Sequence, residues 1–135
     1  MPPFLDDDDT PIVPPRSTFL KVVEIAVPPK CLCLHIQRTF FVGKDLVKDG
    51  SITLFAKSLS LKCRGGGDVV KYELSAIVEH FGRRSRAGHY IAYKRLKLDD
   101  AWLRCSDEMV KEVSWDEVAL SKPYLLFYES VNLLK

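Results

Sequence analysis

Apolar and polar positions alternate with a period of two over several short stretches of the chain, which predicts β-strands. In one of these stretches Tyr72, Leu74, Ala76 and Val78 are expected to share one face. Ser114, followed three residues later by Glu117, predicts a capped helix that ends near residue 120. The fold class predicted is mainly antiparallel β with one short helix (α+β). The expected strands cover residues 19–27, 31–36, 51–55, 59–61, 72–82, 89–93, 102–107 and 124–128.

Composition limits the chain to one domain or part of one, because it has 135 residues of which 47% are hydrophobic. The net charge is +2 with both signs mixed along the chain, which gives no reason to expect nucleic acid or a membrane surface as partner. No apolar run approaches the ~18 residues of a membrane span. Residues 1–18 hold five of the eight prolines and four consecutive aspartates, so they are expected to form a flexible lead-in. The domain is then expected over residues 19–130, with a tail at 131–135.

The four cysteines are interpreted as reduced thiols of a cytosolic protein rather than as disulfides. Cys31 and Cys33 lie within an apolar run expected to be covered on both faces, and Cys105 lies within a predicted strand, so burial is expected for them. No Cys-x-x-Cys pair occurs, so we expect no zinc site, and nothing in the sequence calls for a cofactor.

The candidate chemistry centres on His89, which lies where a polar, glycine-containing loop passes into a strand. A hairpin joining this strand to the next would bring Ser106 or Asp107 beside the imidazole. A histidine and its hydrogen-bonding partner are two of the three groups that a nucleophilic hydrolase site needs. The third group is the nucleophile. A lone histidine beside a glycine is more often structural, and the spacing alone leaves both readings open.

Five segments, in order, resemble ubiquitin-specific proteases. Residues 28–38 resemble their "L-P-x-x-L-x-L-x-L-x-R" strand, 72–82 the strand before their histidine box, and 88–93 (G-H-Y-I-A-Y) the box itself. Residues 102–110 resemble "W-x-x-F-D-D-x-x-V", and 123–128 (P-Y-L-L-F-Y) the closing "A-Y-L-L-F-Y". The resemblance implies a cysteine isopeptidase that cleaves ubiquitin from proteins. It also implies that this chain is the palm and fingers portion of a papain-like fold.

The resemblance further implies roles for particular residues. His89 would be the catalytic base, Ser106 would take the place of the usual Asp or Asn that orients it, and Asp107 would add charge. Gly88 and Tyr90 would contact the Gly-Gly tail of ubiquitin. A serine at the position of Ser106 resembles the mitochondrial outer-membrane member of the family, which implies a location on the cytoplasmic face of that membrane.

One departure from the family limits these expectations. The "G-L-x-N-L-G-N-T-C" box that carries the nucleophile, on the helical thumb, does not occur in this sequence. No cysteine here opens a predicted helix, where its thiolate would be stabilised. We therefore expect the isolated chain to be an inactive fragment of an enzyme, with the thumb supplied elsewhere. The alternatives are a ubiquitin-binding module that does not cleave, a truncated isoform or an incomplete gene model.

Overall fold

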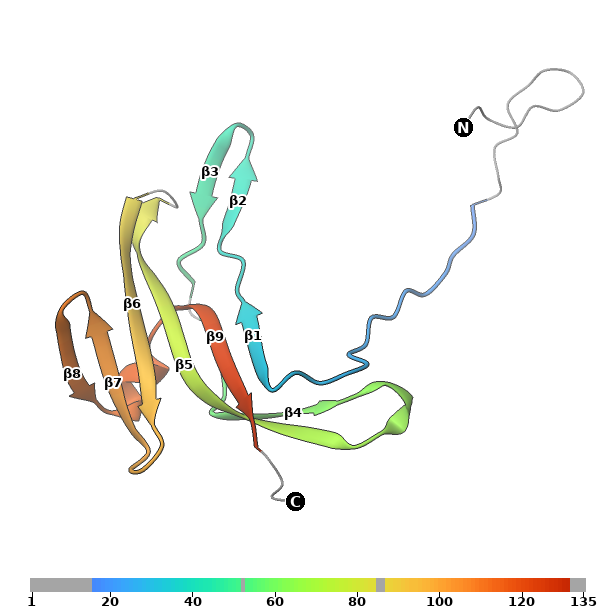
Figure 1. Ribbon diagram of the computed structural model, residues 1–135. Helices are drawn as coiled ribbons and strands as arrows, with labels where there is room; N and C mark the ends of the chain where they lie inside the picture. The colour runs from blue at the N-terminus through green and yellow to red at the C-terminus, as the bar shows by residue number, and fades with distance from the viewer. Residues whose placement is uncertain (1–15, 52, 85–86, 132–135) are drawn as a thin grey trace, which may run out of the picture.

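One long strand, β5, organises the fold. The computed structural model describes residues 16–51, 53–84 and 87–131. Strands β4 and β6 pair with the beginning and the end of β5, while β9 pairs along its middle, and every pairing is antiparallel. The seven-stranded sheet has the order β1-β9-β5-β6-β7-β8, with β4 beside β5 (Figure 1). Its strands are β1 (Cys31–His35), β4 (Ser58–Lys62), β5 (Val69–Arg84), β6 (Ala87–Leu96), β7 (Ala101–Ser106), β8 (Met109–Val113) and β9 (Pro123–Ser130).

The remaining elements are short. Strands β2 (Thr39–Val42) and β3 (Asp45–Lys48) form a separate hairpin, and η1 (Arg64–Gly66) is a single turn of 3-10 helix within the glycine-rich loop. Helix α1 (Trp115–Ala119) follows β8, and its N-cap is Ser114, whose hydroxyl accepts from the Glu117 N–H. The predicted fold class and the predicted cap are both confirmed.

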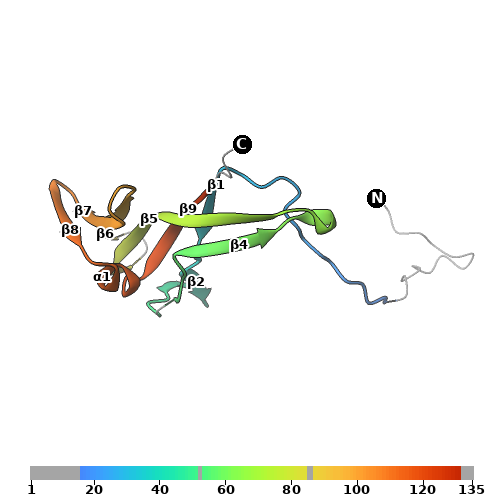
Figure 2. The same cartoon turned by 90° about the horizontal axis from the view of Figure 1, so that it is seen from below.

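Helix α1 lies against the sheet (Figure 2), and its Val118 belongs to the hydrophobic core together with residues of β5, β6, β7 and β9. Trp102 of β7 is 1% exposed and packs against Trp115 of α1, with ring centroids 5.6 Å apart. Phe55 also contacts Trp115 in an edge-to-face arrangement, with ring centroids 5.9 Å apart. This aromatic cluster joins the helix to the sheet, so β7, which carries the candidate site at its far end, is firmly held.

The buried face of β5 changes partway along the strand. Tyr72 and Leu74 are buried, but the next buried residues are Ser75, Ile77 and Glu79, one position out of step. The register between β5 and β9 shifts between Leu74 and Ala76, which identifies a β-bulge. The expectation that Ala76 and Val78 share a face with Tyr72 is therefore wrong, because one extra residue turns the rest of the strand over.

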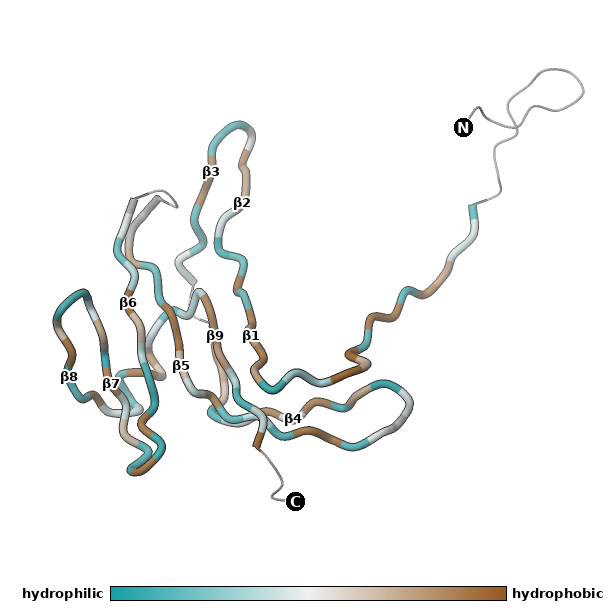
Figure 3. The backbone as a smooth tube through the Cα atoms, viewed as in Figure 1, coloured by the Kyte–Doolittle hydropathy of each residue, from teal (hydrophilic) through white to brown (hydrophobic). Residues whose placement is uncertain are grey.

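Two predicted strands are absent from the described residues. Residues 19–27 form no strand, and Phe19 and Leu20 are almost fully exposed. Residues 51 and 53–55 form none either, and residue 52 lies outside the described part. Figure 3 shows that the N-terminal segment before β1, which contains residues 19–27, carries apolar residues, as β1 and β5 do. Alternation of apolar residues predicts a strand only where a neighbouring strand can accept its hydrogen bonds, and here none is paired.

The prediction that Cys31 and Cys33 are buried is also wrong. Strand β1 is at the edge of the sheet, and its side chains alternate between solvent and core. Leu32 and Leu34 pack against the core, whereas Cys31 and Cys33 are exposed. Cys63 and Cys105 are half-buried, and all four thiols are free. The apolar run was therefore covered on one face only, not on both.

Several expectations lie partly outside the described residues. The predicted lead-in is described only from residue 16, and the predicted tail only at Val131. Within the described part, no helix has the length and apolar character needed to cross a membrane. The same part contains no group of three or more His, Cys, Asp or Glu side chains placed to hold a metal ion.

Candidate active site around His89

His89 lies near the start of β6, at the end of a regular ladder. Its ladder partner on β5 is Phe81, after which the β5–β6 register becomes irregular. Alternation along β6 places His89 on the same face as Ile91 and Tyr93, which are buried. The His89 side chain is 41% exposed. The backbone of His89 is therefore fixed by the sheet, while its imidazole remains accessible.

Ser106 and Asp107 both approach the same ring nitrogen of His89. Ser106 ends β7, and its Oγ lies 2.8 Å from Nε2, a hydrogen-bonding distance. Asp107 begins the two-residue turn into β8 with a φ of 51°, a conformation that aspartate tolerates better than most residues. Its Oδ2 lies 3.8 Å from Nε2, and its side chain is 82% exposed. The hairpin thus brings both predicted partners to His89, but only Ser106 is within hydrogen-bonding distance.

Gly88, immediately before His89, is closely surrounded by the chain itself. Its φ is 154°, and a Cβ placed there would lie 2.0 Å from the Phe81 carbonyl oxygen and 2.6 Å from Nε2 of His80. The backbone conformation and the contact both require glycine here. This reason is internal to the protein, so the proposed contact of Gly88 with substrate stays a separate prediction.

Tyr90 lies on the opposite face of β6 from His89, at the centre of a row of rings. Its ring packs on His80, with centroids 4.6 Å apart, and lies 6.2 Å from Tyr124 of β9. His35 on β1 in turn contacts Tyr124 in an edge-to-face arrangement. Tyr90 is more than half exposed, so one side of its ring is open to a ligand.

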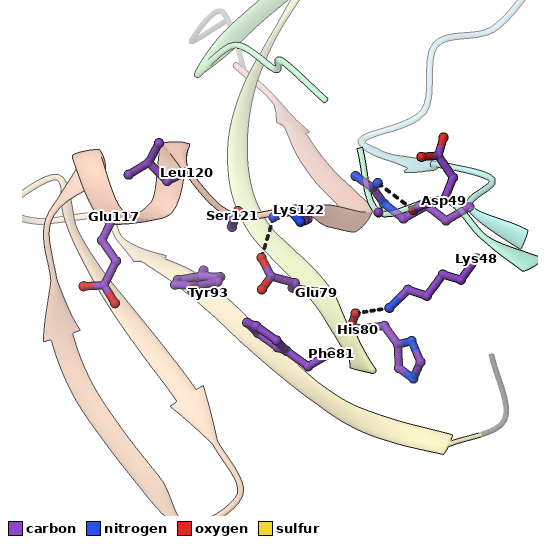
Figure 4. A pocket seen from close by; sticks show the side chains of 12 residues that line it. Lys48, Asp49, Glu79, His80, Phe81, Tyr93, Glu117, Leu120, Ser121 and Lys122 are labelled. Carbon is purple, nitrogen blue, oxygen red and sulfur yellow. Dashed lines mark hydrogen bonds between the residues drawn. The ribbon is translucent and has the colours of Figure 1, made fainter. Parts of the chain in front are cut away.

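Beside the site is a cavity of about 530 Å³, bounded by α1, β5 and the base of the β2–β3 hairpin (Figure 4). It contains none of the five predicted site residues, although Phe81, the ladder partner of His89, is part of its wall. Glu79 points into it, is 4% exposed and accepts a hydrogen bond from the Lys122 backbone N–H. Burial raises the pKa of Glu79, while the Lys122 N–H and the positive charge of Arg104 oppose that shift.

The raised pKa of Glu79 predicts a pH dependence of stability. The folded chain binds this proton more tightly than the unfolded chain, whose glutamate pKa is about 4.3. The stability contributed by Glu79 is therefore complete below that pH and is lost as the pH rises through the folded-state pKa. Glu79→Gln keeps a carbonyl acceptor without a charge, so we expect this variant to lose less stability than the natural chain as the pH rises above about 4.3.

Urea unfolding at a series of pH values measures this effect. Glu117→Gln is the matched control, since Glu117 borders the same cavity but is exposed. Equal pH profiles for the natural chain and Glu79→Gln would show that Glu79 does not carry the effect.

Sequence reasoning assigned no role to Arg38, Glu79 or His80. Arg38 is 4% exposed and donates hydrogen bonds to the carbonyl oxygens of Pro123 and Ser51. It thereby joins the start of β9 to the segment after the β2–β3 hairpin. The available signal was the arginine that closes the motif matched by residues 28–38.

None of the four cysteines is placed to react with His89. Cys105 precedes Ser106 on β7, so its side chain points to the opposite face of the sheet from Ser106. Cys31 and Cys33 lie on β1, which β9 and β5 separate from β6. Cys63 lies at the other end of β5, close to Tyr72. All four are within the described residues, and no hydrogen bond joins any of them to His89.

Comparisons with known proteins agree on one family. The family model described as "Ubiquitin carboxyl-terminal hydrolase" matches residues 15–128. Ubiquitin carboxyl-terminal hydrolase 3 of Mus musculus is 32% identical over 107 residues, covering 74% of this chain and 20% of the relative. Ubiquitin carboxyl-terminal hydrolase 16 of Danio rerio is 32% identical over 142 residues, covering 84% and 17%. The chain thus spans about a fifth of the length of these relatives.

Solved structures give the same result. The Ubp8-Sgf11-Sgf73-Sus1 SAGA DUB module aligns with a TM-score of 0.72 at 30% identity, covering 79% of this chain and 25% of the matched one. The same module bound to ubiquitin aldehyde aligns with a TM-score of 0.72 at 29% identity, covering 78% and 25%. The antiparallel sheet with its short helix therefore corresponds to part of a catalytic domain. The chain belongs to the ubiquitin carboxyl-terminal hydrolase family, whose members are thiol-dependent hydrolases, and comprises part of its catalytic domain.

Proposed function

We propose that this chain supplies the histidine half of a deubiquitinating active site that cleaves isopeptide bonds between ubiquitin and proteins. The observation that carries the proposal is the 2.8 Å contact between His89 Nε2 and Ser106 Oγ, in a chain of this family. Solved relatives of this fold bind ubiquitin, which supports ubiquitin as the ligand. The nucleophilic cysteine would come from outside this chain, because none of its own cysteines is placed to react with His89.

In this proposal the two ring nitrogens of His89 have different tasks. Nε2 carries the proton and donates it to Ser106 Oγ, which leaves the lone pair of Nδ1 free to act as base. Nδ1 would take the proton from the cysteine thiol as the thiolate attacks the isopeptide carbonyl carbon. The same proton would then pass to the lysine amine as the carbon–nitrogen bond breaks. Water would release ubiquitin from the resulting thioester, again with His89 as base.

In most catalytic triads a single carboxylate both orients the histidine and stabilises its positive charge. Here Ser106 would orient His89 and Asp107 would supply the negative charge. The serine hydroxyl fixes the tautomer but brings no negative charge. Asp107 Oδ2, 3.8 Å from Nε2, would stabilise the imidazolium electrostatically, weakened by its exposure to solvent. Gly88 and Tyr90 would contact the tail of ubiquitin, with the open side of the Tyr90 ring as the contact surface.

These separate roles can be measured in the isolated chain. A neutral hydrogen bond is worth about 1 kcal/mol, so we expect Ser106→Ala to speed exchange of the His89 Nε2 proton with water about fivefold. Asp107→Ala should change this rate by less than twofold, because Asp107 is not within hydrogen-bonding distance. The measurement is nitrogen-15 NMR of the imidazole. A larger effect of Asp107→Ala than of Ser106→Ala would reverse the assignment.

A second candidate function is a ubiquitin-binding module without activity of its own. The positions of the four cysteines favour it for the isolated chain. In that case His89 and Tyr90 would still contact ubiquitin, but no thioester would form.

One experiment tests both candidates. The purified chain is mixed with ubiquitin carrying a C-terminal electrophile and read by intact mass, and labelled chain is titrated with ubiquitin by NMR. We expect no covalent adduct and shifts centred on Gly88, His89 and Tyr90. Absence of any shift at these residues would refute both candidates. An adduct on Cys105 that His89→Ala abolishes would instead show that the chain contains its own nucleophile.

A mitochondrial outer-membrane location remains a prediction from the resemblance at Ser106. The relatives reported above give it no support. Imaging of the natural protein with a fluorescent tag is the direct measurement, and a signal away from mitochondria would refute it.

A further inference from the structure

His80, on β5, touches both residues that flank His89. Its Nε2 lies 2.6 Å from where a Cβ on Gly88 would be, so the ring occupies the space that a side chain there would fill. The same ring packs on Tyr90, with centroids 4.6 Å apart and planes at 43°. His80 therefore supports the segment 88–90 from the face opposite to the His89 imidazole.

The backbone of His80 is itself held from two directions. It pairs with Tyr90 in the β5–β6 ladder, and its carbonyl oxygen accepts a hydrogen bond from Lys48 Nζ on β3 (Figure 4). The regular ladder ends one pair further on, at Phe81 and His89. His80 therefore lies next to the end of the regular β5–β6 ladder. Its ring is beside Gly88, which the ladder no longer holds.

We propose that His80 is a positioning residue for His89: its ring packs against Gly88 and Tyr90 and so keeps the imidazole of His89 within reach of Ser106. The catalytic meaning of this role rests on the proposed function of His89, whereas the contacts do not. Burial, and secondarily the positive charge of Lys48, lower the pKa of His80. The ring is then neutral near pH 7 and packs as an aromatic group, so another flat ring should replace it.

The test uses imidazole NMR of the full 135-residue chain, which has only three histidines. In the natural chain we expect His89 to show a single tautomer, protonated at Nε2. In His80→Ala we expect this pattern to be lost to averaging between tautomers, and in His80→Phe we expect it to be restored. His35→Ala is the matched control, because His35 contacts Tyr124 but neither Gly88 nor Tyr90.

Each outcome bears on the proposal. If His80→Ala does not fold, His80→Gln takes its place, since it keeps the length of the side chain without the ring. An unchanged His89 pattern in a folded variant, failure of His80→Phe to restore it, or an equal effect of His35→Ala would overturn the positioning role. The readout needs neither ubiquitin nor a nucleophile. Failure of the ubiquitin titration would therefore refute the proposed function and leave the positioning role of His80 intact. An unchanged His89 tautomer in the His80 variants would refute the positioning role and leave the proposed function intact.

Discussion

Gly88→Ala is expected to destabilise the chain by roughly 2–4 kcal/mol and to break the contact between His89 and Ser106. Two costs combine at this position. The φ of 154° is one that L-residues rarely adopt, and the new methyl group would lie 2.0 Å from the Phe81 carbonyl oxygen. That oxygen belongs to the β5 backbone, so it can move away only if the β5–β6 ladder moves too. Urea unfolding measures the stability, and imidazole NMR measures the state of His89.

A Gly43→Ala variant tests the cost of a positive φ without the steric clash. Gly43 lies in the turn between β2 and β3 with a φ of 63°, but a Cβ there would meet nothing within 4 Å. Only the backbone cost applies, so we expect a loss of about 1 kcal/mol and an unchanged His89 spectrum. Equal losses for the two variants would show that the crowding at Gly88 is relieved without disturbing the ladder.

The sequence predicted those parts of the fold that local rules decide. Alternation identified β5 and β6, the expected hairpin identified β7, and a continuous apolar run identified β9. The pairing of Ser114 with Glu117 identified the start of α1. The proximity of Ser106 to His89 followed from a hairpin between consecutive strands, which is itself a local arrangement. Such features depend on a few neighbouring residues, so a single sequence can reveal them.

Other features depend on partners far along the chain. The bulge near Ser75 arises from pairing with β9, about 50 residues later, and no local pattern marks it. Exposure of Cys31 follows from the place of β1 at the edge of the sheet, which the order of strands decides. The role of His80 depends on the missing side chain of Gly88 across the hairpin. The apolar alternation of residues 19–27 was misleading for the same reason, because a strand requires a partner.

Arg38→Ala is expected to lower the free energy of unfolding by roughly 3 kcal/mol, because a hydrogen bond from a charged group contributes about 1.5–3 kcal/mol. The two carbonyl oxygens that would lose their donor take part in buried and partly buried hydrogen bonds. Arg38 Nε donates to Pro123 O at 2.8 Å, and one terminal nitrogen donates to Ser51 O at 2.7 Å. These bonds diverge from a planar guanidinium, so Arg38→Lys should recover less than half of the loss. Arg95→Ala is the control, since Arg95 pairs with a half-exposed Glu73 and its loss should cost at most about 1 kcal/mol.

The consequence of Arg38→Ala should extend beyond stability. Arg38 joins the start of β9 to the segment after β3, and β3 in turn holds His80 through Lys48. Loosening that segment should therefore broaden the NMR signals of His80 and, through its ring, those of Gly88 and Tyr90. Arg95 lies in the ladder with β7, away from this connection, and its variant should leave these signals sharp. If Arg38→Ala lowers stability while the signals of residues 88–90 stay unchanged, the hairpin and the candidate site are mechanically independent. Broadening confined to the Arg38 variants would show instead that the position of His89 is set jointly by the sheet and by the β2–β3 hairpin.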